Sequence, residues 1–105
     1  MIYVDFSAGG KDYKLRLNTL TVIKLEKKIG KNPLKVFADA KDSGMVSTED
    51  LIEIFYYSLI AFQSDITYEK ACAIFDEWIA EGHIIAEFVP IVVEIYQQAG
   101  LIGKN

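Results

Sequence analysis

The segment that most constrains the fold is LIEIFYYSLIAF, residues 51–62, in which ten of twelve side chains are apolar or aromatic. Only Glu53 and Ser58 interrupt it. A surface helix of a globular domain needs one apolar stripe, whereas this segment is apolar on nearly all sides. It is either a central helix wrapped by its own chain, or a helix covered in part by another chain. We favour the second explanation, because a chain of 105 residues has few elements with which to surround a helix.

The predicted last helix, residues 84–99, shows the same excess. Its apolar residues cover more than one face: Ile84, Ile85, Phe88, Val89, Ile91, Val92, Val93, Ile95 and Tyr96. Tyrosine tolerates a partly wet contact and is enriched at interfaces. The two segments together predict a partner-binding surface, with these candidate residues: Phe55, Tyr56, Tyr57, Phe62, Phe88, Val92 and Tyr96.

The chain before residue 18 has the pattern of a β-hairpin. Apolar and polar residues alternate over 2–6 and again over 13–17, on either side of Gly9 and Gly10, which permit a tight turn. A lone hairpin is marginal in water, so its apolar face must rest on the remaining chain. We therefore predict one mainly helical α+β domain, 1–105, in which a hairpin over 1–17 packs on four to five helices over 18–105.

Helix-terminating residues divide the helical part. Asn18 or Thr19 can cap a helix that ends at Gly30, and Asn32 can cap a short helix with Pro33 in its first position. Further helices are predicted over about 48–62 after Ser47, from about 67 to Gly82, and over about 84–99. Pro90 predicts that the last helix either is kinked or begins near residue 89.

No set of residues suggests catalysis, and we predict no catalytic residue, no metal and no cofactor. His83 is the only histidine and Cys72 the only cysteine, so the chain has no His/Cys cluster for zinc and cannot form an internal disulfide. A free cysteine is typical of a reducing cytoplasm. Asp76, Glu77 and Glu81 are expected on a solvated helix face. An enzyme would need a pocket that combines Asp76, Glu77, His83 or a tyrosine, and we keep this as the least favoured alternative.

The charges are segregated along the chain. Residues 1–45 hold nine basic and five acidic residues, whereas residues 46–105 hold two and ten. The simpler interpretation is two solvated faces. The other is contact between copies, which would join Lys24, Lys27, Lys28 and Lys31 to Glu77 and Glu81. The net charge of −4 argues against nucleic-acid binding. The longest hydrophobic segment, IIAEFVPIVVEIY, is too short to span a membrane.

The order of a hairpin followed by helices, together with three motifs, resembles that of the tail assembly chaperones of long-tailed phages and prophages. The motifs are the L-E-x-x-x-G-x-N-P-L corner over 25–34, the Ser58-Leu59 pair, and the I-T-x-E opening of a helix at Ile66 to Glu69. The resemblance extends from about Asp12 to Ile102.

The resemblance implies a non-enzymatic, self-associating protein of the bacterial host cytoplasm that acts in tail morphogenesis. Such chaperones coat the long helical tape measure protein before the tail tube assembles around it. Many also occur in a longer, frameshifted form that recruits tail tube subunits. The alternative is a small phage or bacterial adaptor or regulator with one dedicated protein partner.

Overall fold

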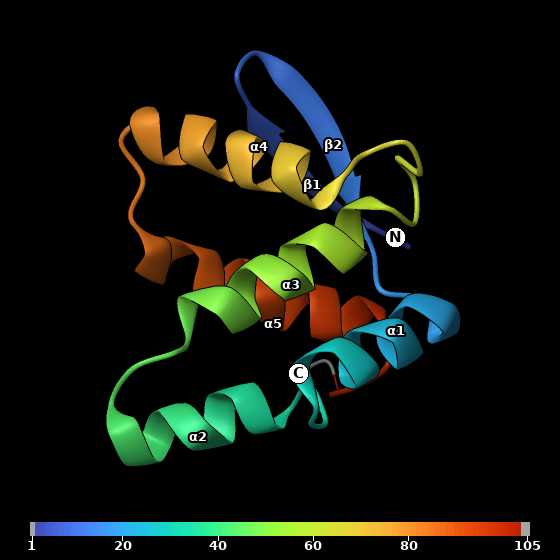
Figure 1. Ribbon diagram of the computed structural model, residues 1–105, viewed down its shortest axis with the longest axis vertical. Coiled ribbons are helices and arrows are strands. Elements are labelled where there is room, and N and C mark those ends of the chain that lie inside the picture. The colour runs from blue at the N-terminus through green and yellow to red at the C-terminus, as the bar shows by residue number, and fades with distance from the viewer. Residues whose placement is uncertain (1, 104–105) are drawn as a thin grey trace.

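Residues 2–103, which the computed structural model describes, form a two-stranded antiparallel sheet and five α-helices. The sheet consists of β1 (Val4–Ala8) and β2 (Lys11–Leu15). The helices are α1 (Thr19–Ile29), α2 (Lys35–Ser43), α3 (Thr48–Leu59), α4 (Tyr68–Ala80) and α5 (Phe88–Gln98), with a 3-10 turn, η1 (Ile85–Glu87), before α5. The predicted α+β, mainly α architecture is confirmed (Figure 1).

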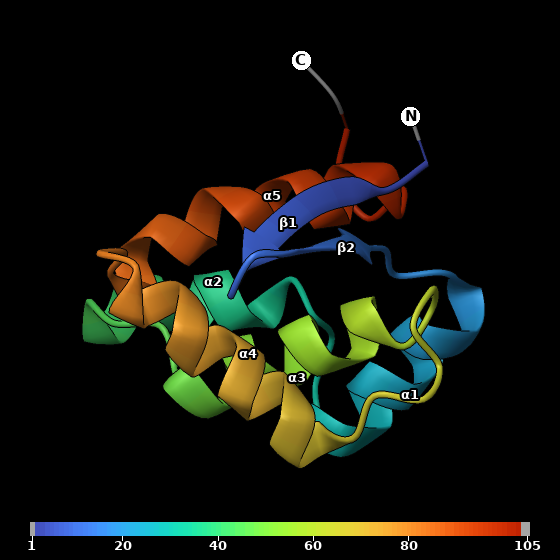
Figure 2. The same ribbon diagram turned by 90° about the horizontal axis from the view of Figure 1, so that it is seen from above.

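The hairpin matches its predicted turn. Gly9 and Gly10 join the strands with φ of 59° and 73°, the pair of positive angles that a type I′ turn requires. Val4 and Phe6 of β1 and Leu15 of β2 are buried, so one face of the sheet is apolar. This face packs against the helices: β1 contacts α4 and α5, and β2 contacts α3 (Figure 2). The helices therefore supply the support that an isolated hairpin lacks.

The free edge of β2 is covered by the segment around the end of α3. The backbone N–H of Arg16 donates to the Ser58 carbonyl at 3.0 Å. The Gln63 amide pairs with both backbone groups of Lys14, accepting from its N–H at 2.9 Å and donating to its carbonyl at 3.0 Å. An uncovered strand edge is a template for pairing with another chain, and these bonds block part of it.

The apolar helix of residues 51–62 is the central helix of the fold. α3 packs against α1, α4 and β2, and Leu51 through Phe55, Ser58 and Leu59 are buried (Figure 1). Most of α3 is therefore a central helix wrapped by its own chain, and our preference for cover by another chain is corrected. The surrounding elements include the hairpin, which covers one side of the helix by a long-range contact that local sequence does not reveal.

An aromatic cluster joins four elements at the centre of the core. Phe6 of β1, Phe55 of α3, Phe75 and Trp78 of α4, and Phe88 of α5 form this aromatic cluster. Phe88 meets the other four at ring-centroid distances of 5.3–6.2 Å, in steeply inclined geometries. Such edge-to-face contacts add to the free energy of area burial. Phe88 is thus the point at which the C-terminal helix is fixed to the hairpin and to the α3–α4 pair.

The chain turns sharply between α1 and α2. Gly30 ends α1 in the left-handed conformation, with φ of 74°. The predicted short helix begins later than expected, at Lys35, because Asn32, Pro33 and Leu34 first form a turn in which the Asn32 side chain accepts from the Leu34 N–H. The buried Tyr96 hydroxyl donates to the Pro33 carbonyl at 2.9 Å, and this bond fixes the turn to α5.

The remaining helix ends follow their local signals with small differences. Asn18, Ser47 and Thr67 accept capping hydrogen bonds at the starts of α1, α3 and α4, so Asn18 is the correct one of the two caps expected for α1. α3 ends at Leu59, three residues earlier than expected. α5 begins at Phe88, so Pro90 lies in its first turn, where the missing N–H has no partner to lose. Of the two expectations for Pro90, the late start is the correct one.

Candidate functional site

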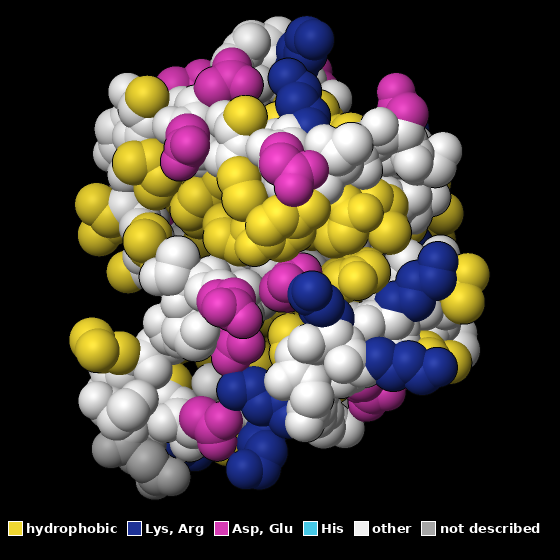
Figure 3. Space-filling model, viewed as in Figure 1, with side chains coloured by type: hydrophobic (Ala, Val, Ile, Leu, Met, Phe, Trp, Pro, Cys, Tyr) yellow, Lys and Arg dark blue, Asp and Glu magenta, His cyan; other side chains and the backbone are white. Residues whose placement is uncertain are grey.

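A hydrophobic band crosses the face of the molecule between α3 and α4, with acidic side chains on both sides of it (Figure 3). Part of this band is an open cavity of about 500 Å³. We call this cavity the α3–α4 groove; its lining residues are Thr48, Ile52, Cys72, Phe75, Asp76, Ile79, His83, Ile84 and Ile85. Apolar side chains from both helices and from the η1 turn therefore share one concave surface.

Ile84 and Ile85 form the outer wall of the groove. α4 ends at Ala80, and the chain passes through Gly82 in the left-handed region, with φ of 105°, before Ile84 continues in an extended conformation. This path leaves the Ile84 side chain 61% exposed beside the groove. A smaller cavity of about 350 Å³, lined in part by Met45 and Val89, also includes Ile85. The hydrophobic surface thus continues around the N-terminal end of α3.

The polar groups of the groove lie at its rim. The His83 ring stacks on Trp78, with centroids 4.4 Å apart and planes inclined by 5°, and His83 Nδ1 lies 2.7 Å from a Glu87 carboxylate oxygen. Asp76 lines the same cavity, whereas Glu77 lies beside Gly9 of the hairpin. The fold therefore does not gather Asp76, Glu77 and His83 in one pocket. Among the side chains that the structure describes, no group of three His, Cys, Asp or Glu is placed to hold a metal ion.

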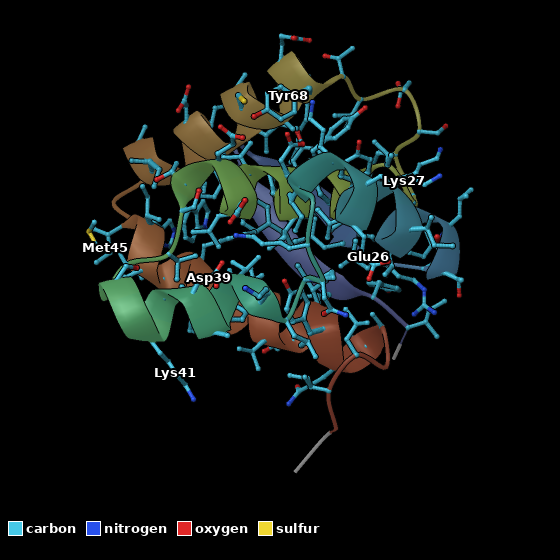
Figure 4. All side chains as sticks on the ribbon, turned by 60° about the horizontal axis from the view of Figure 1, so that its bottom comes forward. Glu26, Lys27, Asp39, Lys41, Met45 and Tyr68 are labelled. Atoms are coloured by element: carbon cyan, nitrogen blue, oxygen red, sulfur yellow. The ribbon has the colours of Figure 1, made fainter. Side chains whose placement is uncertain are left out.

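Beyond the groove, the band between α3 and α4 continues into a second pocket of a different chemical character. We call it the tyrosine pocket; its volume is about 330 Å³ and its lining residues are Lys28, Glu49, Glu53, Tyr56, Tyr57 and Tyr68. Tyr56 meets Tyr57 at 5.0 Å and Tyr68 at 5.7 Å, with ring planes inclined by 65° and 76°. Figure 4 marks Tyr68 at the start of α4. The steep angles make the rings walls of the pocket rather than a stack.

Glu53 is the unusual residue of the tyrosine pocket. It is only 4% exposed, yet within residues 2–103 its carboxylate has no hydrogen-bond donor and no ion-pair partner. No fully buried side-chain oxygen of the described residues lacks a partner, so the Glu53 oxygens meet solvent in the pocket that they line. Burial raises the pKa of Glu53, the positive charge of Lys28 lowers it, and Glu49 and Asp50 raise it further.

The shifted pKa has a consequence for stability. Because the pKa of Glu53 in the folded chain is above the value for an unfolded chain, the ionised carboxylate lowers the free energy of unfolding at neutral pH. This cost disappears as the pH falls through the raised pKa towards the ordinary pKa of a glutamate. The fold thus retains a carboxyl group whose ionised form destabilises it.

The predicted partner-binding residues separate into two groups. Phe55, Phe88, Val92 and Tyr96 are 0% exposed, so in this fold they present no surface to a partner, and their assignment is corrected. They are core residues because the hairpin, α4 and the 30–34 turn cover them. Tyr56 and Tyr57 are half-buried in the tyrosine pocket.

Phe62 lies apart from both pockets. It is 43% exposed and packs edge-on against Tyr3, with centroids 5.7 Å apart. The Lys14 ammonium lies 5.8 Å from its ring centroid. Phe62 therefore packs beside the hairpin and belongs to neither pocket.

The residues predicted for contact between copies are only partly free for that role. Lys24, Lys27 and Lys28 are exposed on α1. Lys31 instead forms ion pairs with Asp50 at 2.8 Å and Asp39 at 3.1 Å, which raise the pKa of Lys31. Figure 4 shows Asp39 facing the space between α2 and α3, while Lys41 points away from the body. Lys31 thus links α2 to α3 within one chain.

The two acidic residues of this set, Glu77 and Glu81, also make contacts within the chain. A Glu81 carboxylate oxygen accepts from the Gly9 N–H at 2.9 Å, and the Glu77 carboxylate lies against Gly9. Both residues are exposed, yet they hold the hairpin turn to the end of α4. Contact between copies through Glu77 and Glu81 would have to form around this internal role.

Sequence reasoning missed the residues of the α3–α4 groove, above all Ile52, Cys72 and Ile79. One signal pointed towards it. Ile84 and Ile85 follow Gly82, shortly after the end of α4, where apolar residues are not needed for helix packing. This signal was visible in the sequence, but the concave surface arises only when α3 and α4 lie side by side.

Comparisons with known proteins give no relatives: no family model, no curated protein and no solved structure matches this chain. Within residues 2–103, no helix has the length and apolar character needed to cross a bilayer.

Proposed function

We propose that this protein is a non-enzymatic assembly chaperone that holds an amphipathic helix of a client protein in the α3–α4 groove. The observation that carries the proposal is the groove itself, an apolar concavity that no other element of residues 2–103 covers. Ile84, in its outer wall, leaves 61% of its surface exposed in the free protein. Apolar surface gathered in a concave site is typical of binding to another molecule.

The geometry supports a helix as the bound element. α3 and α4 flank the hydrophobic band, and an amphipathic helix can place residues spaced at i, i+3, i+4 and i+7 along it. Glu49, Glu69 and Asp76 lie on these two helices, so a client helix with basic residues beside its apolar stripe is complementary in charge.

The client that we propose is the tape measure protein of a long-tailed phage or prophage. This part rests on the resemblance of the 25–34 corner and the Ile66–Glu69 opening to tail assembly chaperones, together with the long helical nature of such a client. A chaperone must later release its client. Many copies that each bind one helical segment with moderate affinity achieve both coating and release.

Co-expression with the tape measure protein of the same genome tests this function. We expect a complex with many copies of the chain per client, measured by size-exclusion chromatography with light scattering. A client shortened to half its helical length should bind about half as many copies, because each copy occupies one segment. A fixed small ratio, independent of client length, would instead indicate an adaptor, and absence of any complex would contradict the proposal.

A further inference from the structure

The tyrosine pocket contains a charge without a partner. Ionised side chains are almost never buried unless they are paired, because removal from water is costly. Glu53 exposes only 4% of its surface, and its carboxylate has no partner among residues 2–103. The carboxylate lines the pocket together with three tyrosine rings. The Glu53 oxygens meet only the solvent of the pocket, so a cation that enters from outside can pair with them.

The chemistry of the pocket selects the kind of partner. An anion would be repelled by Glu53 and Glu49, and a neutral apolar group would leave the Glu53 charge unpaired and drier than before. A metal ion needs more ligands than these two carboxylates supply, and the described residues hold no group of three. An organic cation gains both from the carboxylate and from the faces of the aromatic rings.

We propose that the tyrosine pocket binds one organic cation, the guanidinium or ammonium head of a basic side chain from a partner protein, between Glu53 and the rings of Tyr56, Tyr57 and Tyr68. The volume of about 330 Å³ accommodates such a group, since one water takes up only ~30 Å³. The charge of Glu53 also raises the pKa of Tyr57 and of Tyr68, after burial itself, so the carboxylate acts on both rings.

The pocket and the α3–α4 groove lie along the same pair of helices. Tyr68 is one turn before Cys72 on α4, and Ile52 is one turn before Tyr56 on α3. A helix in the groove could therefore place a basic residue in the pocket. The origin of the cation rests on the proposed function, whereas binding of a cation by the pocket does not and is tested without any client.

Titration of the ¹⁵N-labelled protein with butylguanidinium, butylammonium and tetramethylammonium chlorides, followed by NMR, measures this binding. We expect saturable shifts confined to the amides around Glu53, Tyr56, Tyr57 and Tyr68, with Kd on the order of 10 mM for the best probe. Sodium chloride at equal ionic strength and neutral butanol are the controls. Equal shifts with butanol, or no saturable shifts with any cation, would overturn the proposal.

Two substitutions, one that removes a negative charge and one that removes a positive charge of the pocket, test the role of Glu53 in cation binding. Glu53→Gln keeps the shape of the side chain and should weaken binding at least tenfold, while its melting temperature rises by a few degrees because a buried charge is lost. Lys28→Gln removes the competing cation that lines the pocket and should tighten binding about two- to threefold. Tyr68→Leu removes one aromatic face of the pocket and should bind the cation more weakly than the wild type does. Unchanged binding in Glu53→Gln, or weaker binding in Lys28→Gln, contradicts the assignment.

The three probes also identify the source of the cation. Preference for butylguanidinium or butylammonium supports a basic side chain of a partner, whereas preference for tetramethylammonium by tenfold or more would overturn that source in favour of a free quaternary amine. The two proposals fail separately. A client that still binds when no small cation does removes only this inference, and cation binding without any client complex removes only the proposed function.

Discussion

Replacing Phe88 by alanine is expected to lower the free energy of unfolding by about 3–5 kcal/mol. Phe88 is fully buried and meets Phe6, Phe55, Phe75 and Trp78, so its removal leaves a cavity that these rigid rings from three other elements cannot close. A domain of this size is stable by only about 5–15 kcal/mol in total. The variant should therefore lose much of its stability and show a markedly lower urea midpoint.

Phe62→Ala is the matched control for this change. Phe62 is also aromatic and also lay among the predicted partner-binding residues, but it is 43% exposed at the edge of the hairpin. We expect its replacement to cost less than about 1 kcal/mol. Both variants can be followed by circular dichroism in urea. Similar losses for the two would show that Phe88 is not at the centre of the core.

Replacing Ile84 by glutamate is expected to weaken client binding at least tenfold while leaving the fold intact. Ile84 forms the exposed wall of the α3–α4 groove, at 61% exposure, so a charged side chain there costs little in the free protein. In the complex the same carboxylate would be buried against the apolar face of the client helix, which is unfavourable by far more than the lost contact alone. The added negative charge also increases the acidity of a groove that already includes Asp76.

Leu20→Glu provides a control of the same chemistry at another place. Leu20 is 60% exposed on α1 and does not line the groove. The change adds the same charge to an equally exposed apolar position, and we expect client affinity within twofold of the wild type. Affinities measured by isothermal titration with a helical segment of the tape measure protein compare the two. Equal loss in both variants would indicate an effect of net charge rather than of the groove.

The elements of this fold could be predicted because their signals are local. The caps at Asn18, Ser47 and Thr67 and the Gly9-Gly10 turn each depend on a few neighbouring residues, whereas the sequence around Pro90 left both a kink and a late helix start open. Such signals act through backbone geometry and hydrogen bonds within one turn, so they can be identified without knowledge of the tertiary structure. The exact start of α2 was missed, because the turn formed by Asn32, Pro33 and Leu34 delays the helix to Lys35.

The distribution of apolar surface could not be predicted in this way. Periodicity shows that α3 is apolar all round, but whether the hairpin or another chain covers it depends on contacts between residues far apart in sequence. Ser58 illustrates this point: its carbonyl accepts from the backbone N–H of Arg16, which directly follows β2 and is distant along the chain. Residues 84 and 85 were predicted inside a helix, yet they form the exposed wall of the groove instead.

Glu53 connects the stability of the fold to the proposed binding. A buried charge without a partner lowers the free energy of unfolding, and natural proteins retain such groups mainly where function requires them. Its place between three tyrosines, on the same helix pair as the groove, gives the molecule two adjacent surfaces of different character. One is apolar and suited to a hydrophobic stripe, and the other is suited to a single positive charge.

The protection of Cys72 tests the use of the groove most directly. Cys72 is the only cysteine of the chain, is half-buried, and lines the groove, so its reaction with iodoacetamide reports whether the groove is occupied. A double variant, Cys72→Ala with Lys11→Cys, carries its one thiol on the exposed hairpin and is the control. We predict that a saturating client slows alkylation of Cys72 at least tenfold and leaves alkylation of the hairpin thiol in the control variant unaffected. An unchanged rate at Cys72 in a formed complex would show that the client binds elsewhere.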